Sequence, residues 1–245
     1  MRHEIYSAAD RGQANHGWLK ARHTFSFAGY NNPKRVHFGA LRVLNDDVID
    51  AGQGFPTHPH ENMEIVTIPL EGQIAHKDSM GNGETLSVGE VQVMSAGTGI
   101  RHSEYNPNDN KKTALFQIWV FTKKKNRKPD YGQRAFSSKD RQNRWQALVS
   151  PSGSNSRDKK QGALLIHQDA WFKRADFNAD IDFTYKLENP KSGVFLMVID
   201  GSIEIKGQTL HKRDAIGLTQ FADLPEFSAK SLKKTELLLI EVPMS

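Results

Sequence analysis

The stretch Ile65–Lys77 reads IVTIPLEGQIAHK, and the stretch Val194–Lys206 reads VFLMVIDGSIEIK. In each stretch an apolar run leads into an acidic residue followed by glycine, and a second short run leads out. Glycine tolerates a positive φ, so an acidic residue followed by glycine between two such runs is typical of a β-hairpin. We therefore predict two β-hairpins whose glycines, Gly72 and Gly201, lie 129 residues apart.

Two further pairs of segments follow these hairpins in the same order. Leu86–Glu90 (LSVGE) is similar to Leu210–Asp214 (LHKRD) at a spacing of 124 residues, and Leu115–Val120 (LFQIWV) is similar to Leu237–Val242 (LLLIEV) at 122. The decreasing spacing indicates one unit used twice, with shorter loops in the second copy. The region Lys123–Gly162, rich in Lys, Arg, Ser, Asn and Gln, is expected to connect the copies.

Short β-type runs bounded by Gly, Asn, Asp and Pro dominate the whole chain, and we expect helix only in short pieces such as Asp169–Arg174. The fold class is all-β, with two tandem antiparallel β-barrels or sandwiches assigned to residues 1–135 and 136–245. The predicted strands are His37–Leu44, Glu64–Leu70, Gln73–Lys77, Glu90–Met94, Leu115–Phe121, Ala163–His167, Phe183–Leu187, Val194–Ile199, Ser202–Lys206, Ala215–Leu218 and Leu237–Val242.

Composition excludes several classes of protein. The 245 residues are 37% hydrophobic and 25% charged, which is typical of a globular chain and not of a disordered one. No apolar run approaches the length that crosses a bilayer, so we expect no membrane partner. The first residues lack the apolar core of a secretory signal, which favours the cytoplasm. The absence of cysteine excludes disulfides and thiolate metal sites, so any metal must be held by His and carboxylate.

Charge gives little support for a nucleic-acid partner. The net charge is +5, and we expect no specific binding to nucleic acid. The positive residues gather in the block Lys123–Lys128, which has no interleaved aromatic residues for stacking on bases. We interpret this block as a solvated loop, with contact to a phosphate or a protein partner as the alternative.

The segment GQGFPTHPHENME carries His58 and His60, whose side chains share one face of a strand because side chains alternate. The segment GTGIRHSE supplies a second pair at the same spacing, His102 and Glu104. Three imidazoles and a carboxylate, without cysteine, suit Fe(II) or a similar divalent ion that keeps positions open for substrate.

A second carboxylate, Glu64, competes with Glu104 for the fourth ligand position. Glu64 lies four residues after His60, about 13 Å along the chain if the strand is straight, and a bend at Pro59 or a bulge is the alternative that would bring it back. Glu104 lies two residues after His102, so both side chains point the same way on an extended segment. This spacing favours Glu104.

The two segments resemble the paired motifs of the cupin superfamily. Residues at the motif positions are Gly52, His58, His60 and Glu64 in the first and Gly89, Gly97, His102 and Asn106 in the second. The chain departs from the pattern, since Gly72 falls one residue late and Ser95 stands where Pro is usual. In most metal cupins the carboxylate ligand would be Glu64.

A narrower resemblance, to the pirin family and its bacterial quercetinase-like members, rests on longer strings. These are NHGWL and HTFSF near the N-terminus, HPH with ME, LEG, HKDS, MSAGTGIRHSE and FQIW. The resemblance implies a bicupin with two jelly-roll-like β-barrels facing each other, of which only the N-terminal one binds metal. The ligands it implies are His58, His60, His102 and Glu104, with Glu64 in a supporting role.

The second copy independently lacks a matching site. The positions equivalent to His58 and His60 are Leu187 and Asn189, and its histidines, His167 and His211, form no His-x-His pair.

The remaining residues near these motifs receive structural interpretations. We expect His76 to be a hydrogen-bonded structural histidine, with a place in the lining of the pocket as the alternative, and His23 to pack against its aromatic neighbours. Phe55, Met63 and Met94 are expected to line an apolar cavity or to fill the core.

The activity that the resemblance implies is a metal-dependent dioxygenase that opens the central ring of flavonols such as quercetin with O₂ and releases CO. Glu104 would accept the proton of the flavonol 3-hydroxyl. The expected cofactor is one divalent metal ion, Fe(II), with Ni, Co, Mn, Cu or Zn as alternatives, and the partners are a flavonoid-like molecule and O₂. The alternative is a non-enzymatic, iron-dependent regulator that binds a protein partner. We expect a monomer.

Overall fold

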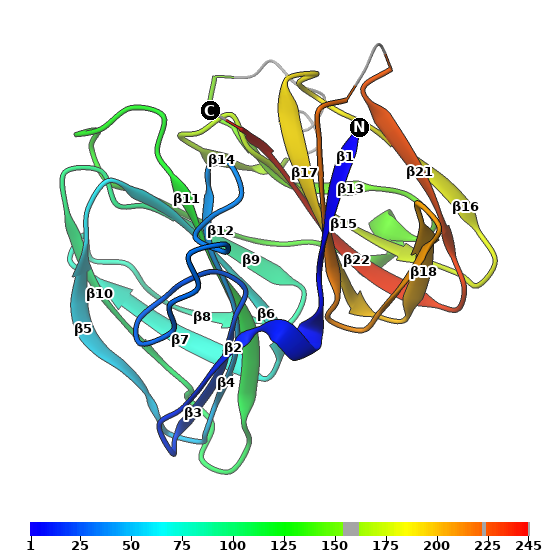
Figure 1. Ribbon diagram of the computed structural model, residues 1–245. Coiled ribbons are helices and arrows are strands. Elements are labelled where there is room, and N and C mark those ends of the chain that lie inside the picture. The colour runs from blue at the N-terminus through cyan, green and yellow to red at the C-terminus, as the bar shows by residue number, and fades with distance from the viewer. Residues whose placement is uncertain (154–161, 222–223, 245) are drawn as a thin grey trace. The chain divides into compact units, whose positions relative to one another are not determined.

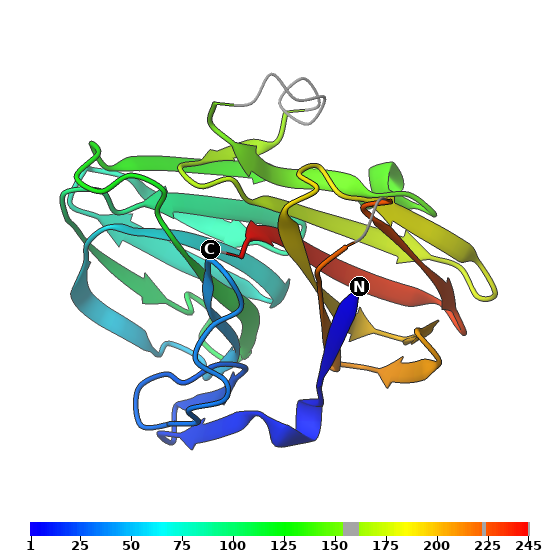
Figure 2. The ribbon, with the colours of Figure 1, turned by 45° about the horizontal axis from the view of Figure 1, so that its top comes forward.

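The computed structural model describes residues 1–153, 162–221 and 224–244. The chain forms two compact units. The N-terminal unit comprises Gly12–Phe136 and Leu164–Gln168, and the C-terminal unit comprises Met1–Arg11, Ser137–Ala163 and Asp169–Ser245. Strands dominate both units (Figures 1 and 2), and the helical elements of the described residues are two short 3-10 turns, Ala8–Asp10 and Ser138–Arg141. The all-β prediction is confirmed.

The N-terminal unit consists of two antiparallel sheets. The larger has the strand order β12-β9-β6-β11-β4-β3-β2, and the smaller has the order β5-β10-β7-β8. The strands are β2 (Gly12–Asn15), β3 (Leu19–His23), β4 (Leu41–Ile49), β5 (Gly54–His60), β6 (Met63–Glu71), β7 (Gln73–Asp78), β8 (Gly83–Ser87), β9 (Glu90–Ser95), β10 (Ile100–Tyr105), β11 (Thr113–Phe121) and β12 (Asp130–Ala135). The short strand β14 (Leu164–Ile166) belongs to this unit and lies near β9 and β12.

The C-terminal unit repeats this two-sheet arrangement. The strands of this unit in its larger sheet have the order β1-β20-β17-β22-β15-β13, and its smaller sheet has the order β16-β21-β18-β19. The strands are β1 (Arg2–Tyr6), β13 (Gln146–Pro151), β15 (Trp171–Phe177), β16 (Asp182–Lys186), β17 (Ser192–Asp200), β18 (Ser202–Ile205), β19 (Gln208–His211), β20 (Ala215–Thr219), β21 (Glu226–Ser231) and β22 (Thr235–Pro243). Buried apolar residues of both sheets form its core.

The predicted repeat is confirmed by hydrogen bonds at equivalent positions. Thr113 opens β11, and its hydroxyl donates to the carbonyl of Gln73 over 2.6 Å. Thr235 opens β22, and its hydroxyl donates to the carbonyl of Ser202 over 3.0 Å. The two threonines are 122 residues apart, the spacing predicted for this strand. In each unit the threonine therefore links the start of its strand to the acid–glycine turn. The predicted β-hairpins are wrong, because each turn joins a strand of the larger sheet, β6 or β17, to a strand of the smaller sheet, β7 or β18, with which it does not pair.

The glycines of the two acid–glycine turns, Gly72 and Gly201, have the positive φ that the sequence predicts. Gly72 has φ of 70° and Gly201 has φ of 95°, a region that residues with a Cβ atom rarely adopt. A Cβ atom would also come within 2.8 Å of the threonine hydroxyl at Gly72 and within 2.4 Å at Gly201. Both turns therefore need glycine for its conformation and for the close approach of the next strand.

The next turn of the repeat is also built alike in the two units. The backbone N–H of Ser87 donates to the carboxylate of Glu90 over 2.7 Å, and the N–H of His211 donates to that of Asp214 over 2.9 Å. These pairs lie 124 residues apart, as the sequence comparison predicts. The acidic residue is thus the shared feature of the turn.

The helix predicted at Asp169–Arg174 is wrong, because this segment enters strand β15. All seven residues of β15 are buried, including Lys173 and Arg174. Their charges are paired, since Lys173 Nζ lies 2.5 Å from Glu188 and Arg174 lies 2.8 Å from Glu236. Lys173 and Arg174 are therefore the cationic ends of two ion pairs, and their aliphatic stems are buried in the strand.

The first residues of the chain do not join the strands that follow them. β1 pairs with β20, and the Tyr6 ring lies 5.0 Å from that of Phe195, so residues 1–11 belong to the C-terminal unit. His167, which the repeat places in the second copy, lies in the N-terminal unit. The long segment of the N-terminal unit ends at Phe136.

Candidate metal centre

Three histidines converge in the smaller sheet of the N-terminal unit. β5 and β10 are antiparallel neighbours, and their register places His102 directly opposite His58. His60 lies two residues along β5, on the same face. The ring centroids are 4.5 Å apart for His58 and His102 and 4.9 Å apart for the other two pairs. One ligand nitrogen from each ring lies within 4.8 Å of the others, which is the arrangement that a shared metal ion requires.

The electronic state of these imidazoles suits metal binding. Burial and the neighbouring His58 lower the pKa of His60 to about 4, and burial with the neighbouring histidines lowers that of His102 to about 2. Both rings are therefore neutral, and a neutral imidazole has the lone pair that a metal needs. Neither nitrogen of buried His102 has a hydrogen-bond partner among the described residues. The residues present thus fit a divalent ion.

The third ring has a fixed orientation. Nδ1 of His58 lies 2.8 Å from the carbonyl oxygen of Pro56, which only accepts, so Nδ1 carries the proton. Nε2 is then the nitrogen with the free lone pair. A backbone carbonyl that fixes the tautomer in this way is a common support for a metal-binding histidine.

Glu104 lies on the same strand as His102, with a β-bulge against β5 between them. Its carboxylate is buried, and the side-chain amide of Gln117 on β11 donates to both oxygens, at 3.2 and 3.0 Å. Gln117 is itself held by the hydroxyl of Thr67, which donates to its oxygen over 3.1 Å. Burial raises the pKa of Glu104 to about 7, and hydrogen bonds from Gln117 and Thr67 oppose that shift. The sequence analysis assigned no role to Gln117, although it lies in the string FQIW.

Glu64 is placed elsewhere because the chain turns after His60. The turn passes through Asn62, whose φ is 50°, and Glu64 then begins the larger sheet on β6 instead of continuing β5. On β6 it alternates with Thr67, so the two side chains project from opposite faces. Its carboxylate accepts from the Ser95 hydroxyl over 2.6 Å and from the His167 backbone N–H over 3.1 Å. The chain therefore does not run straight from His60 to Glu64, and the turn between β5 and β6 carries Glu64 onto the other sheet.

His76 on β7 lies against the histidine group, with its ring centroid 5.2 Å from that of His102. Its other face stacks on Tyr131 of β12 at 5.1 Å and 16°. Neither ring nitrogen of His76 has a hydrogen-bond partner among the described residues. The predicted hydrogen-bonded structural role of His76 is therefore wrong, and the ring packs between the site and Tyr131.

A cavity of about 310 Å³ adjoins the histidine group. Its polar lining includes His58, His60, Glu104 and Gln117, and its aromatic lining is Phe27, Phe55 and Trp119. The prediction that Phe55 lines a cavity is confirmed, whereas Met63 and Met94 pack in a separate apolar cluster. His23 also lines the cavity and packs on Phe27 at 5.4 Å. The site is thus an apolar pocket with its metal-binding groups on one wall.

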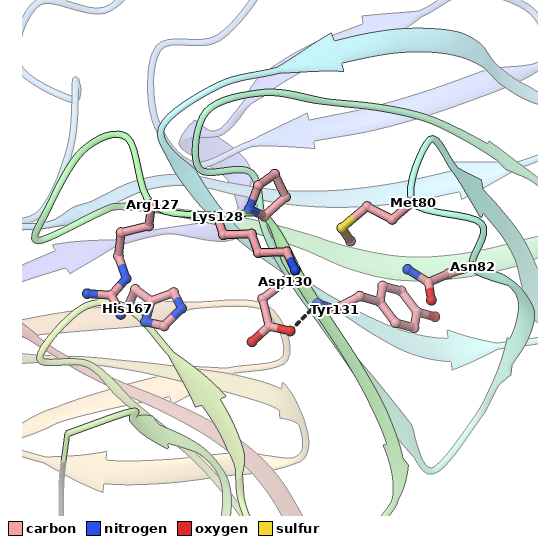
Figure 3. Close-up of a pocket in the computed structure, with 8 residues that line it drawn as sticks. Met80, Asn82, Arg127, Lys128, Asp130, Tyr131 and His167 are labelled. Atoms are coloured by element: carbon pink, nitrogen blue, oxygen red, sulfur yellow. Dashed lines mark hydrogen bonds between the residues drawn. The ribbon is translucent and has the colours of Figure 1, made fainter.

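A second, wider cavity of about 580 Å³ lies in the same unit. Figure 3 shows its lining, which includes Arg127, Lys128 and Tyr131, with the Tyr131 backbone N–H donating to the Asp130 carboxylate over 2.9 Å. Arg127 and Lys128 end the basic block of the sequence, so part of that block faces a cavity. Tyr131 lines this second cavity, and its ring also stacks on His76 beside the histidine group.

Within the described parts of the chain, none of the helices is both long and apolar enough to span a membrane.

The sequence and the fold are both similar to those of known proteins. The family model "Pirin" matches residues 6–120, and the model "Quercetinase C-terminal cupin domain" matches residues 154–242. The chain is 42% identical over 239 residues to a protein of Escherichia coli K12 named quercetin 2,3-dioxygenase, covering 98% of each chain. It is 40% identical to a pirin-like protein of Caulobacter vibrioides, over 94% of this chain and 95% of the other. The crystal structure of the bacterial pirin YhhW from E. coli in complex with nickel(II) superposes with a TM-score of 0.89, at 40% identity, over the full length of both chains.

Proposed function

Because the chain belongs to the pirin family, we propose that it is a metal-dependent dioxygenase that opens the central ring of flavonols such as quercetin with O₂ and releases CO. The observation that carries this proposal is the convergence of three imidazoles beside an aromatic-lined cavity, with His58 and His60 among the residues that line it. The full-length similarity to a protein named quercetin 2,3-dioxygenase supports the substrate class.

In this proposal one divalent ion is held by His58, His60 and His102, with Glu104 as the fourth ligand. Fe(II) is the expected ion, and the same donor set accepts Ni, Co, Mn, Cu or Zn, since availability and not affinity alone decides occupancy. The nickel complex of the E. coli relative supports a divalent ion as the cofactor. We assign the metal site to the N-terminal unit alone, as the positions equivalent to the histidine pair are Leu187 and Asn189.

The bound metal would supply Lewis acidity, which lowers the pKa of a coordinated hydroxyl. The protein supplies the base: the Glu104 carboxylate accepts the proton of the flavonol 3-hydroxyl. Gln117 donates to both oxygens of that carboxylate and so holds it in place. Thr67 in turn orients Gln117, so the base is fixed from the opposite sheet.

The cavity fits the shape of the proposed substrate. A volume of about 310 Å³ is at the lower end of the range for small-molecule sites. Phe27, Phe55 and Trp119 offer flat apolar surfaces against which an aromatic ring system packs. These surfaces also exclude water from the deprotonated substrate.

The test removes the metal with a chelator and restores each candidate ion separately, measuring O₂ uptake and CO release with quercetin. Restored turnover with one or more ions is expected. His58→Ala, His60→Ala and His102→Ala should each lose most of the bound metal and the turnover, whereas the matched His211→Ala variant of the C-terminal unit should keep both. Retention of metal by all three site variants, or no CO from any reloaded protein, would overturn the proposal.

The rival hypothesis, an iron-dependent regulator that binds a protein, draws on Arg127 and Lys128, which line the second cavity (Figure 3). Two cations there suit an acidic partner surface. Stoichiometric capture of one partner that depends on reduced iron, from a protein without flavonol turnover, would favour this hypothesis.

A further inference from the structure

The cavity beside the histidine group has a polar side that the proposed chemistry does not use. Asn45 and Asp47 lie two residues apart on β4, so they project from the same face of the strand, and both line the cavity. His23 on the adjacent strand β3 also lines it, and its Nδ1 lies 2.9 Å from the Asn45 side-chain oxygen. His23 and Asn45 thus have each other as partners, whereas Asp47 does not share in this pair.

Asp47 is a buried carboxyl group, one of whose oxygens has no hydrogen-bond partner among the described residues. Its exposed fraction is 4%, and the unpartnered oxygen is Oδ1. Burying a polar group unpaired costs stability, so such a group in a folded protein calls for an explanation. Burial, with the nearby charges of Asp46 and Glu104, raises the pKa of Asp47 to about 8. The neutral acid both donates and accepts a hydrogen bond.

The rest of the lining indicates what a partner for this carboxyl group must be. Phe27, Phe55 and Trp119 favour a flat aromatic frame. The Nε1 atom of Trp119 is also buried and without a partner among the described residues, so a second polar atom on this lining is unsatisfied. A ligand that carries hydroxyl groups on the edge of an aromatic frame matches both features.

We propose that Asp47 is a specificity-determining residue, which binds a phenolic hydroxyl of the substrate other than the one held at the histidine group. The site then selects polyhydroxylated flavonols over those that carry the 3-hydroxyl alone. This inference rests on the proposed function, because it takes a flavonol bound through its 3-hydroxyl as given.

The experiment measures binding separately from turnover. Zn(II)-loaded protein, which is redox-inert, is titrated with quercetin and with 3-hydroxyflavone, whose only hydroxyl is the 3-hydroxyl, by calorimetry and tryptophan quenching. Wild-type protein should bind quercetin at least about tenfold more tightly, the effect of one buried hydrogen bond. Asp47→Leu should reduce this affinity ratio to near one, whereas Asp47→Asn, which keeps a donor and an acceptor, should retain most of it. Asp46→Asn is the matched control, since Asp46 is not among the residues lining the cavity.

Equal affinity of the wild type for the two flavonols would overturn the proposal, even if Asp47→Leu fails to fold. An unchanged ratio in Asp47→Leu would overturn it as well. Failure of the proposed function is distinguishable, because selective binding without CO release from the Fe(II)-loaded protein refutes the dioxygenase alone. Turnover of both flavonols with equal kcat/KM and equal affinity refutes the specificity role alone.

Discussion

Two buried glutamates, Glu104 and Glu64, are the candidates that the sequence offers for the fourth ligand, and their different partners predict different effects of the same substitution. Glu104→Gln removes the proposed base and fourth ligand, so turnover should fall by about 10²- to 10⁴-fold and metal binding should weaken. Glu64→Gln disturbs hydrogen bonds to Ser95 and His167. It should cost about 1–3 kcal/mol of unfolding free energy and leave turnover largely intact.

The measurement is metal stoichiometry, flavonol turnover and urea unfolding for both variants side by side. Each variant is the control for the other, because the chemical change is identical. Loss of metal from Glu64→Gln with retention by Glu104→Gln would show that this chain uses the carboxylate of the general cupin pattern.

The pKa of Asp47 predicts a pH dependence of stability in the metal-free protein. The folded state holds this proton up to about pH 8, whereas the unfolded chain releases it near pH 3.8. Between these values the folded state binds more protons, so this residue makes the unfolding free energy fall as pH rises, by up to about 1.4 kcal/mol per pH unit. Asp47→Asn has no such proton to lose.

Urea unfolding at pH 5, 6, 7 and 8 should therefore show Asp47→Asn gaining stability relative to wild type as pH rises. Asp109→Asn, at an exposed position, is the control. If the difference in unfolding free energy between Asp47→Asn and the wild type stays constant from pH 5 to pH 8, Asp47 is ionised in the folded protein at every pH tested.

At the residue scale, alternation along a strand is what made part of the site predictable. His58 with His60, and His102 with Glu104, are close in sequence, and their shared faces follow from local geometry. Gln117 and Asp47 were not predictable in the same way. Their roles arise from where the larger sheet places them relative to the site, which no local spacing encodes.

At the scale of elements, the acid–glycine signal located both turns because turn chemistry is local. The hairpin prediction was wrong, because the two strands that each turn joins do not pair: β6 and β7 lie in different sheets, and so do β17 and β18. Strand β15 was mispredicted since its burial on both faces removes the alternation that identifies a strand. The carboxylates that neutralise Lys173 and Arg174 come from elsewhere in the chain, on β22 for Arg174, and the segment alone does not reveal them.

The acid–glycine turn between β17 and β18 gives a test of how much the close approach of β22 contributes to stability. Gly201→Ala would place a Cβ atom 2.4 Å from the Thr235 hydroxyl oxygen and 2.5 Å from the Lys234 carbonyl oxygen, at a φ of 95°. Gly207→Ala is the matched control, since Gly207 has a φ of 70° but no atom within 4 Å of the added Cβ. Gly207→Ala should cost about 1–2 kcal/mol from backbone conformation alone.

Gly201→Ala should cost clearly more than its control in urea unfolding, because the threonine and its strand must also move. Equal costs for the two variants would show that the close approach to β22 is not needed for the turn.

At the scale of the whole molecule, duplication was visible in the sequence because each unit keeps its own acid–glycine turn, the turn that follows it and the long strand near its end. The sequence did not reveal that the first residues of the chain belong to the C-terminal unit. β1 is short, with only Tyr6 buried, and its partner β20 lies more than 200 residues away. Local pattern therefore assigned residues 1–11 to the strands that follow them.

The placement of β1 predicts which unit depends on Tyr6. Its ring is 3% exposed and packs edge-on against Phe195 of β17, so Tyr6→Ala leaves a cavity in the C-terminal unit. Replacing a buried aromatic ring by alanine costs about 3–5 kcal/mol. Amide hydrogen exchange should therefore show lost protection in β17 and β20, with β6 and β11 unaffected and metal still bound. Ile74→Ala, in the core of the N-terminal unit, should give the reverse pattern. Lost protection in β6 and β11 on Tyr6→Ala would instead place the first residues with the N-terminal unit.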